Sequence, residues 1–359
     1  MFSRLLGFLF AKKVIKTRFY QGQGLGNQLW MYAVVRGLAL QRQSAHKIEC
    51  AWRFKGASFL QIDNGKWSCY FPTTNPRKNY FGLITSRFVE EKSFIANVPL
   101  DFTSFQHIPI KHRIRLEGNF ESEGYFKAYE NIIRNELQVK HPIEVPENLC
   151  LINVRGKDFI GNSQVVLRRN YYDNAMSQIL QRNPFASFAI VTDDVDYAKQ
   201  VVPGITILSR NAKGRGIDSA KIAHDFSLLQ NAKMLIISNS SFGWWAAWTN
   251  LNNPLVIAPR FWAAHNLDLE IWSPNSILTS NWCWLSKEGE LRESKSEEKL
   301  IKEGKVKSLR NMENLITSSD WIPGRTKMRI RSKVYKSLSR LNLIDLAITK
   351  RCKIRLNRE

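Results

Sequence analysis

Between residues 149 and 258 the chain alternates short apolar runs with longer runs of helical spacing, and this alternation restricts the possible folds more than any other feature. Repeated strand-helix alternation at this spacing favours parallel strands, because each helix carries the chain back across the sheet. We therefore predict an α/β fold with a doubly wound parallel sheet. The expected strands are 149–154, 188–192, 205–208, 234–238 and 255–258, and the expected helices are 171–181, 221–231 and 242–248, with a shorter one ending near residue 200.

A further strand, loop and helix precede this region. Residues 14–20 mix β-branched and aromatic side chains, 21–26 form a glycine-rich turn, and 28–43 have helical spacing. Residues 44–115 are aromatic and punctuated by Pro and Asn, and we expect irregular structure there. Helical spacing returns over 121–137.

The chain has 359 residues and is 44% hydrophobic, which is enough apolar material for two domains with separate cores. The stretch 141–147 contains two prolines and reads as a linker. We predict an N-terminal Rossmann-like domain over residues 1–145, a second Rossmann-like domain over 146–290, and a basic appendage over 291–359.

The charge is strongly basic, with 53 Lys and Arg against 31 Asp and Glu and a net charge of +22. Such an excess favours nucleic acid, an anionic membrane face or phosphorylated small molecules as partners. Apolar residues at helical spacing over 334–348 fit an amphipathic helix at a membrane surface, or equally a helix packed on the catalytic domain. The apolar run at 5–10 is too short to span a bilayer, so we expect at most a surface foot there.

The cysteines and histidines indicate no metal centre. Five scattered cysteines include no C-x-x-C pair, and the six histidines show no metal-ligand spacing. The cysteine pattern fits a reducing cytoplasm best.

The glycine-rich loop could bring a ligand close to the backbone. Gly24 and Gly26 lie between the first expected strand and its helix, where a dinucleotide fingerprint would lie, although that fingerprint would require glycine at Asn27. A plain turn is the alternative. The amides of Asn27 and Gln28 at the helix start could hydrogen-bond sugar hydroxyls or a reacting oxygen.

Arg155 follows the strand 149–154, at the strand end where open α/β sheets bind ligands. A guanidinium stabilises the negative charge that builds on a leaving diphosphate. Asp158 could orient Arg155, or the two could form an ordinary surface ion pair.

The end of the expected strand 234–238 could bind a phosphate group. Hydroxyls and backbone N–H groups gather there at a helix start, and serine N-capping is the alternative explanation. The residues concerned are Asn239, Ser240, Ser241 and Phe242. The stripe Trp244, Trp245 and Trp248 fits core packing better than a stacking platform.

Acidic residues end another expected strand. Asp194 and Asp196 form a D-x-D that could hold a divalent cation, although acids in a first helical turn are also favoured by the helix dipole. Asp193, nearest the strand end, could instead touch a nucleotide.

Together these segments resemble the α-1,2-fucosyltransferases, glycosyltransferase family eleven, of the bacterial surface-glycan type. The resemblance covers roughly residues 18–285 and departs from the family pattern His-x-Arg-Arg-Gly-Asp at Asn153, Gly156 and Lys157. It is carried by GLGNQL at 24–29, LEGNFESE at 116–123, NVRGKD at 153–158, DFSLL at 225–229 and IISNSSF at 236–242.

The resemblance implies a GT-B-like pair of Rossmann-type domains with parallel sheets facing across a cleft, a GDP-fucose donor, inversion at the anomeric carbon and no metal or other cofactor. The domain over 1–145 would be the acceptor side, with acceptor recognition in 44–115, and the domain over 146–290 would bind the donor. Arg155 would contact the diphosphate, Ser240, Ser241 and Phe242 would line the phosphate site, and Asn27 would lie near the acceptor or glycosidic oxygen. An acceptor hydroxyl, for example the 2-OH of a galactose-type residue, would attack fucose C1 directly. Asp158 or another loop carboxylate could act as base, or leaving-group departure could dominate.

The expected partners are GDP-fucose and an oligosaccharide acceptor that could be lipid-linked, with no nucleic acid. The enzyme would lie in the cytoplasm, peripheral on the inner face of an anionic membrane. A metal-dependent glycosyltransferase with another donor, using Asp194 and Asp196, is the nearest alternative, and a basic nucleic-acid-binding protein is the alternative from another class.

Overall fold

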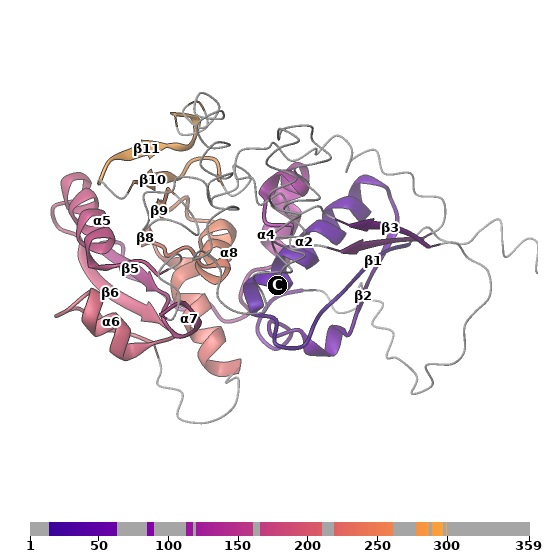
Figure 1. Cartoon of the computed structure of the whole chain (residues 1–359), viewed down its shortest axis with the longest axis horizontal. Helices are drawn as coiled ribbons and strands as arrows, with labels where there is room; N and C mark the ends of the chain where they lie inside the picture. The colour runs from indigo at the N-terminus through magenta and orange to yellow at the C-terminus, as the bar shows by residue number, and fades with distance from the viewer. Residues whose placement is uncertain are drawn as a thin grey trace, which may run out of the picture.

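The computed structural model describes residues 14–62, 85–89, 113–117, 120–160, 166–209, 219–260, 278–286, 289–296 and 299. These residues form two α/β units, each built on its own sheet (Figure 1). We call the unit with the first sheet the N-terminal unit and the unit with the second sheet the C-terminal unit. The predicted pair of Rossmann-type units with parallel sheets is confirmed.

The sheet of the N-terminal unit has four parallel strands in the order β2-β1-β4-β3. Its strands are β1 (Val14–Arg18), β2 (Ala45–Glu49), β3 (Thr85–Val89) and β4 (Arg113–Glu117), and its long helix is α2 (Leu25–Gln41). The expectation of irregular structure over 44–115 is therefore wrong, because β2, β3 and part of β4 lie in that range.

Charged side chains interrupt the apolar runs by which these strands could be recognised in the sequence. In β2 the residues alternate between buried and more accessible positions, and Glu49 at its end forms ion pairs with side chains of β1 and β4. Arg115 Nη2 of β4 lies 2.7 Å from Glu49 Oε1, and Lys16 Nζ of β1 lies 3.6 Å from the same oxygen. Strands that carry ion pairs on one face lack the continuous apolar run of a strand buried on both faces.

The expected helix over 121–137 begins as two 3-10 turns, η3 (Glu123–Tyr125) and η4 (Lys127–Tyr129), and becomes helix α4 (Glu130–Glu136). Glu136 anchors α4 to α2, because it accepts hydrogen bonds from Tyr32 Oη at 2.6 Å and from Arg36 Nη2 at 2.6 Å. The predicted linker 141–147 is a loop without helix or strand, and leads from the N-terminal unit to β5.

The sheet of the C-terminal unit has seven strands in the order β11-β10-β9-β8-β5-β6-β7. The strands are β5 (Leu149–Val154), β6 (Ser187–Thr192), β7 (Thr206–Ile207), β8 (Met234–Ile236), β9 (Leu255–Pro259), β10 (Cys283–Leu285) and β11 (Leu291–Glu293), and the helices are α5 (Arg169–Arg182), α6 (Val195–Val201), α7 (Ser219–Asn231) and α8 (Ser241–Thr249). All neighbours pair in parallel except β11, which is antiparallel to β10.

Every predicted strand and helix of this second region is present. One correction concerns its end, because β11 falls within the residues expected to form an appendage and instead extends the sheet. Short antiparallel edge strands such as Leu291–Glu293 have no apolar run to reveal them.

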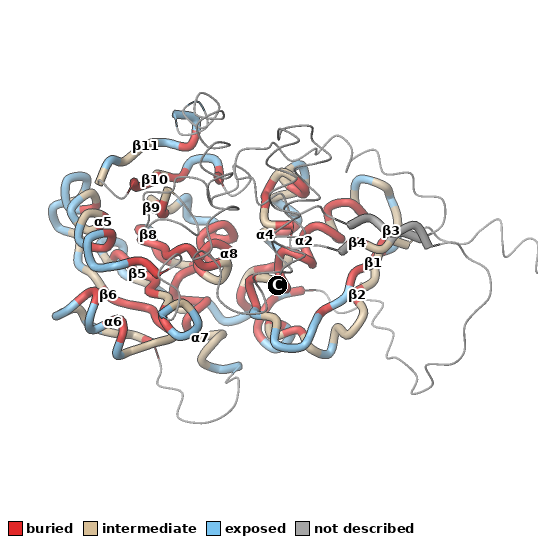
Figure 2. The backbone as a smooth tube through the Cα atoms, in the orientation of Figure 1, coloured by how far each residue is buried: buried red, intermediate tan, exposed pale blue. Residues whose placement is uncertain are grey.

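Helices α2 and α8 lie between the two sheets, and their contact is buried (Figures 1 and 2). The Trp30 ring of α2 lies 4.1 Å from the Trp244 ring and 4.8 Å from the Trp245 ring of α8, measured between centroids. Trp248 is also fully buried and stacks on Trp244 at 5.8 Å. The expectation that this tryptophan stripe packs in the core is confirmed, and it forms the seam between the units.

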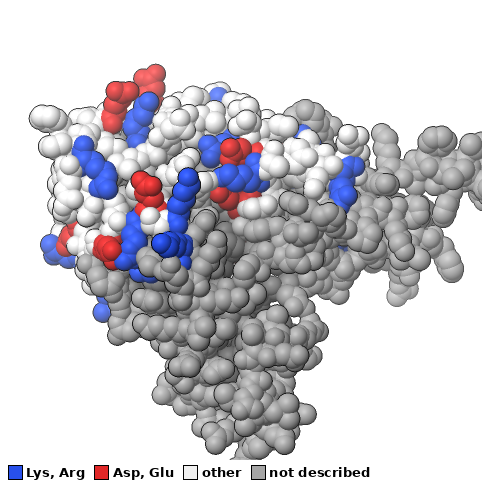
Figure 3. All heavy atoms as spheres, turned by 90° about the horizontal axis from the view of Figure 1, so that it is seen from above, with Lys and Arg blue, Asp and Glu red and all other residues white. Residues whose placement is uncertain are grey.

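The expected surface foot at 5–10 and the amphipathic helix over 334–348 lie outside the described residues. Within the described ranges, no helix combines the length and the apolar character needed to cross a membrane. On the face drawn in Figure 3, basic and acidic side chains of the described residues are interspersed.

Candidate functional site

A cavity of about 720 Å³ opens between the two units, at the carboxyl ends of β5 and β6 and at the first turns of α2 and α8. Open α/β sheets bind ligands at this edge, because the loops after parallel strands converge there. Every residue that the sequence predicts for catalysis or donor binding lines this one cavity: Gly24, Gly26, Asn27, Arg155, Asp158, Asp193, Asn239, Ser240, Ser241 and Phe242.

The first turns of α2 and α8 meet at the cavity. The hydroxyl of Ser241 donates a hydrogen bond to Asn27 Oδ1 at 3.0 Å and so joins the N-terminal unit to the C-terminal unit. The N–H groups of a first helical turn have no partner within the helix, and the helix dipole adds partial positive charge. Two helix starts at one cavity wall suit an anionic ligand.

The three glycines of the loop have different roles. Gly22 has φ +78, which only glycine adopts without strain, so it serves the turn. A Cβ on Gly26 would lie 2.5 Å from the Ser241 carbonyl carbon, so Gly26 permits the close approach of α8. A Cβ on Gly24 would meet nothing within 4 Å. Gly24 lines the cavity, and neither a positive φ nor close packing requires glycine there.

Arg155 is fixed mainly by Asp193. The Arg155 Nη1 group donates to Asp193 Oδ2, and the backbone N–H of Gly156 donates to Asp193 Oδ1 at 2.9 Å. The sequence left open whether Asp158 orients Arg155 or forms an ordinary surface ion pair with it. The Asp158 Oδ2 lies 3.4 Å from Arg155 Nη2 and its side chain is 86% exposed, as in a surface ion pair. Asp193 therefore positions the guanidinium, with both carboxylate oxygens already engaged.

The departure from the family pattern after Arg155 has a structural counterpart. A Cβ on Gly156 would lie 2.4 Å from the Cβ of Asp194, so no larger residue fits there. Lys157, where the family pattern has glycine, adopts φ +36 and lines the cavity. The second basic residue of the pattern is thus displaced by one position, onto a backbone conformation that favours glycine.

The D-x-D is part of a helix start. Asp194 is the N-cap of α6: its Oδ1 accepts from the Tyr197 backbone N–H at 3.0 Å, and its Oδ2 accepts from the Lys157 N–H at 3.0 Å. Asp196 lies in the first turn of α6. Among the described residues, no three His, Cys, Asp or Glu side chains gather as metal ligands would.

The cavity also contains charged residues that the sequence hypothesis did not use: Lys55, Glu121, Lys157, Lys221 and Asp225. Burial, and then the charge of Arg155, lower the pKa of Lys55. Lys55 therefore brings a second cation toward Arg155 from the opposite unit, and an anion between them would relieve the repulsion.

Asp225 is buried in α7 beneath the cavity and is 5% exposed. It accepts from Ser209 Oγ at 3.0 Å, and its Oδ1 lies 3.2 Å from His224 Nδ1. Burial raises the pKa of Asp225, while these hydrogen bonds lower it. DFSLL at 225–229 was the signal available in the sequence, because a carboxylate in an otherwise apolar motif needs polar partners.

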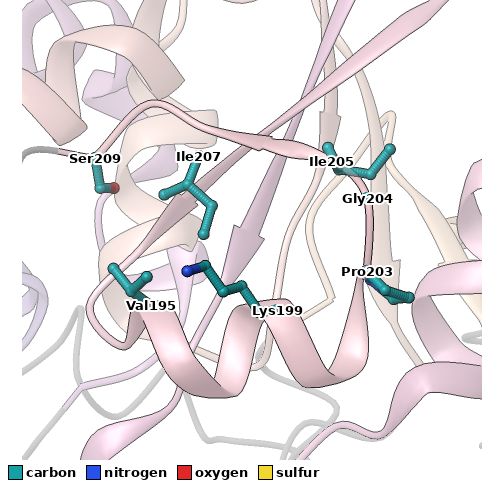
Figure 4. Close-up of a pocket in the computed structure, with 7 residues that line it drawn as sticks. All are labelled: Val195, Lys199, Pro203, Gly204, Ile205, Ile207 and Ser209. Carbon is teal, nitrogen blue, oxygen red and sulfur yellow. The ribbon is translucent and has the colours of Figure 1, made fainter.

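A second cavity, of about 520 Å³, lies beside the edge strand β7. Figure 4 shows its lining, in which the Lys199 side chain rises from α6 toward Ile207. The lining is otherwise mainly apolar, and no residue predicted for the site lies in it.

Comparisons with known proteins identify the family of this chain. Residues 91–286, more than half of the chain, match the family model described as Glycosyl transferase family 11. An alpha-1,2-colitosyltransferase from Escherichia coli is 26% identical over 271 residues, which cover 67% of this chain and 89% of the relative. The O-antigen biosynthesis glycosyltransferase WbnK, also from Escherichia coli, is 26% identical over 163 residues, which cover 41% of this chain and 52% of the relative.

Solved structures with a similar fold include Arabidopsis thaliana FUT1 in complex with GDP, with 13% identity, a TM-score of 0.45 and 79% of each chain covered. NodZ alpha-1,6-fucosyltransferase soaked with GDP-fucose has 13% identity and a TM-score of 0.37, covering 68% of this chain and 97% of NodZ. The family match over residues 91–286 decides the assignment, and the chain belongs to glycosyl transferase family 11.

Proposed function

We propose that this glycosyltransferase moves L-fucose from GDP-fucose, with inversion, to the 2-OH of a galactose-type residue in a surface-glycan acceptor. Family membership supports the reaction class. The observation that carries the donor assignment is the convergence of Arg155 and the first turns of α2 and α8 on one cavity between the units. That arrangement suits a ligand with a diphosphate at one end and a sugar at the other.

In the proposed reaction, Arg155 and the N–H groups at the start of α8 stabilise the negative charge that develops on the leaving GDP. Lys55 would add a cation from the other unit. The acceptor hydroxyl attacks fucose C1 from the face opposite the diphosphate, the C1–O bond to GDP breaks, and the hydroxyl proton leaves to a carboxylate or water. Asn27 lies near this exchange, and Asp158 and Glu121 are the carboxylates of the lining proposed for proton removal.

We propose that no metal takes part. Support comes from Asp194, whose oxygens accept backbone N–H groups, and from the cationic residues that line the cavity. The alternative is a metal-dependent transferase with another donor that uses Asp194 and Asp196.

The acceptor and the location complete the proposal. The relatives' names, which include an O-antigen glycosyltransferase, favour a surface-glycan precursor as acceptor. We place the enzyme in the cytoplasm at the inner membrane face, where the net charge of +22 would attract anionic lipid.

The test is thermal unfolding of the purified protein with GDP, GDP-fucose, GDP-colitose, UDP and UDP-sugars, each with and without EDTA. A ligand that binds only the folded state raises the unfolding temperature. We expect stabilisation by GDP species only, insensitive to EDTA, and transfer from GDP-fucose to galactose-terminated oligosaccharides with the new linkage read by NMR. Preference for GDP-colitose would correct the donor sugar, and a UDP or metal requirement would overturn the proposal.

A further inference from the structure

Two aromatic side chains stand exposed at one edge of the N-terminal sheet. Trp52 is 62% exposed and Tyr20 is 49% exposed. The other tryptophans among the described residues are at most 6% exposed, so Trp52 differs from them in lying at the surface. Contact between an aromatic ring and water is unfavourable in free energy compared with burial of the ring. Surfaces on which several such rings are exposed are commonly contact sites.

Both rings follow the carboxyl ends of neighbouring parallel strands. Tyr20 comes after β1 and Trp52 after β2, and the Phe19 backbone N–H donates to Glu49 O at 3.0 Å where the two strands end. The loop after β1 leads directly to the cavity: Gln23 Oε1 accepts from the Tyr20 N–H at 3.2 Å, and Gln23 Nε2 donates to Asn27 O at 3.4 Å.

The loop of Trp52 is tied to the same helix start. Gln28, which is 1% exposed, donates from Nε2 to Arg53 O at 2.8 Å and accepts at Oε1 from the Lys55 N–H at 2.9 Å. Lys55 lines the cavity, three residues after Trp52. The loop that carries Trp52 is therefore tied to the start of α2 and reaches the cavity lining at Lys55, on the unit opposite Arg155.

The Trp52 ring has a defined partner on its surface. The Arg53 guanidinium carbon lies 4.6 Å from the ring centroid, a cation–π arrangement that restrains the ring. The indole face opposite Arg53 is also electron-rich, so it would attract the weakly positive C–H groups that line one face of a galactose-type sugar. The sugar hydroxyls stay at the rim, where guanidinium and phenol groups donate hydrogen bonds.

We propose that Trp52, with Tyr20 and Arg53, is a stacking site for sugar residues of the acceptor glycan. The site lies at the cavity rim on the N-terminal unit, and it would hold residues adjoining the one that receives the transferred sugar. This inference rests on the proposed function for its acceptor class. A neutral oligosaccharide is the occupant, because a stacked pyranose needs an open ring face and edge donors and no charge of its own.

The first test is oxidative footprinting of Trp52 by N-bromosuccinimide, with peptides read by mass spectrometry. Lactose, N-acetyllactosamine and, as a polyol without a ring, mannitol are added separately, with and without GDP. We expect either disaccharide to lower the Trp52 oxidation rate about threefold or more, and mannitol to leave it unchanged. Equal oxidation with every sugar overturns the proposal, and the readout requires no donor.

The second test separates acceptor from donor kinetics. For Trp52→Ala we expect an acceptor KM raised about tenfold, with GDP stabilisation and donor hydrolysis unchanged, and for Trp52→Phe a KM within about threefold of wild type. Phe185→Ala is the matched control, because Phe185 is 85% exposed and precedes the amino end of β6, whereas the cavity lies at the carboxyl end of that strand.

Each result assigns the failure to one hypothesis. If GDP-fucose does not stabilise the wild-type protein but the disaccharides still slow Trp52 oxidation, the donor assignment is refuted and the stacking site is retained. An unchanged acceptor KM in Trp52→Ala, with normal donor turnover, refutes the stacking site alone. Equal effects of Trp52→Ala and Phe185→Ala would also refute it, because a general loss of stability would then explain both.

Discussion

Ser241 donates a hydrogen bond to Asn27 at 3.0 Å, and this contact holds the first turns of α8 and α2 together across the two units. Gly26 allows it, because any side chain there would enter the backbone of Ser241. Behind the contact, Trp30 and Trp244 pack with ring centroids 4.1 Å apart. The cavity therefore has a rigid wall where the donor is proposed to bind.

Gly26→Ala should weaken both stability and ligand binding. The new Cβ would lie 2.5 Å from the Ser241 carbonyl carbon and 2.7 Å from the Phe242 nitrogen, and backbone atoms cannot rotate away. We expect a loss of about 1–3 kcal/mol in the free energy of unfolding, measured in urea, together with weaker stabilisation by GDP.

The matched control for Gly26→Ala is Gly24→Ala, two residues earlier in the same loop. A Cβ on Gly24 meets no atom within 4 Å, and its φ of −68 suits alanine. We expect no loss of stability in this variant. Equal losses in both variants would contradict the packing role of Gly26.

Asp193→Asn should lower turnover more than it lowers nucleotide binding. The amide would keep the shape but lose the charge that fixes the Arg155 guanidinium, and a small misplacement of a catalytic group costs about 100-fold in rate. We expect kcat to fall about 10- to 100-fold in a transfer assay, with stabilisation by GDP largely retained. Asp196→Asn is the control, because Asp196 lies in the first turn of α6 and does not line the cavity, and an equal fall in kcat there would contradict the positioning role of Asp193.

Lys157→Gly should make the protein more stable and less active. Its φ of +36 strains a lysine by about 1 kcal/mol, which glycine would release, while the cation would disappear from the cavity lining. We expect a higher unfolding temperature and an affinity for GDP about three- to tenfold lower. Lys157→Arg keeps both strain and charge, so it should match wild type in both measurements.

The sequence predicted the C-terminal sheet well and the N-terminal sheet poorly, for one physical reason. Strand β5 is buried along almost its whole length, so its residues form an apolar run that stands out. Strand β2 alternates in burial, and its Glu49 serves ion pairs with Lys16 and Arg115. Such pairs exist only once the sheet has formed, so short local patterns do not reveal them.

The site shows the same division. Arg155 and Ser240 could be predicted because each follows an apolar strand at the carboxyl edge, where the fold itself places a ligand. The role of Asp193 depends on its distance from Arg155, which is set by the pairing of β5 with β6. Lys55 has no motif at all, and only the approach of the two units brings it to the cavity.

His46 should make the protein less stable as the medium becomes acidic. It is 7% exposed, and burial, followed by the charge of Arg36, lowers its pKa from 6.5 to about 4. The unfolded chain therefore binds a proton more tightly than the folded protein. Stability is fully present above the unfolded pKa and falls as the pH drops through the interval from 6.5 to about 4.

His46→Phe measures this contribution, because it keeps an aromatic ring beside Tyr32, whose ring centroid lies 6.4 Å from that of His46. The difference in unfolding free energy between wild type and variant at about pH 7.5 gives the packing effect alone. At about pH 5 the wild type should lose about 2 kcal/mol relative to the variant, as measured by urea unfolding at both pH values. A difference between the two proteins that does not change with pH would mean that His46 becomes protonated in the folded state as readily as in the unfolded chain.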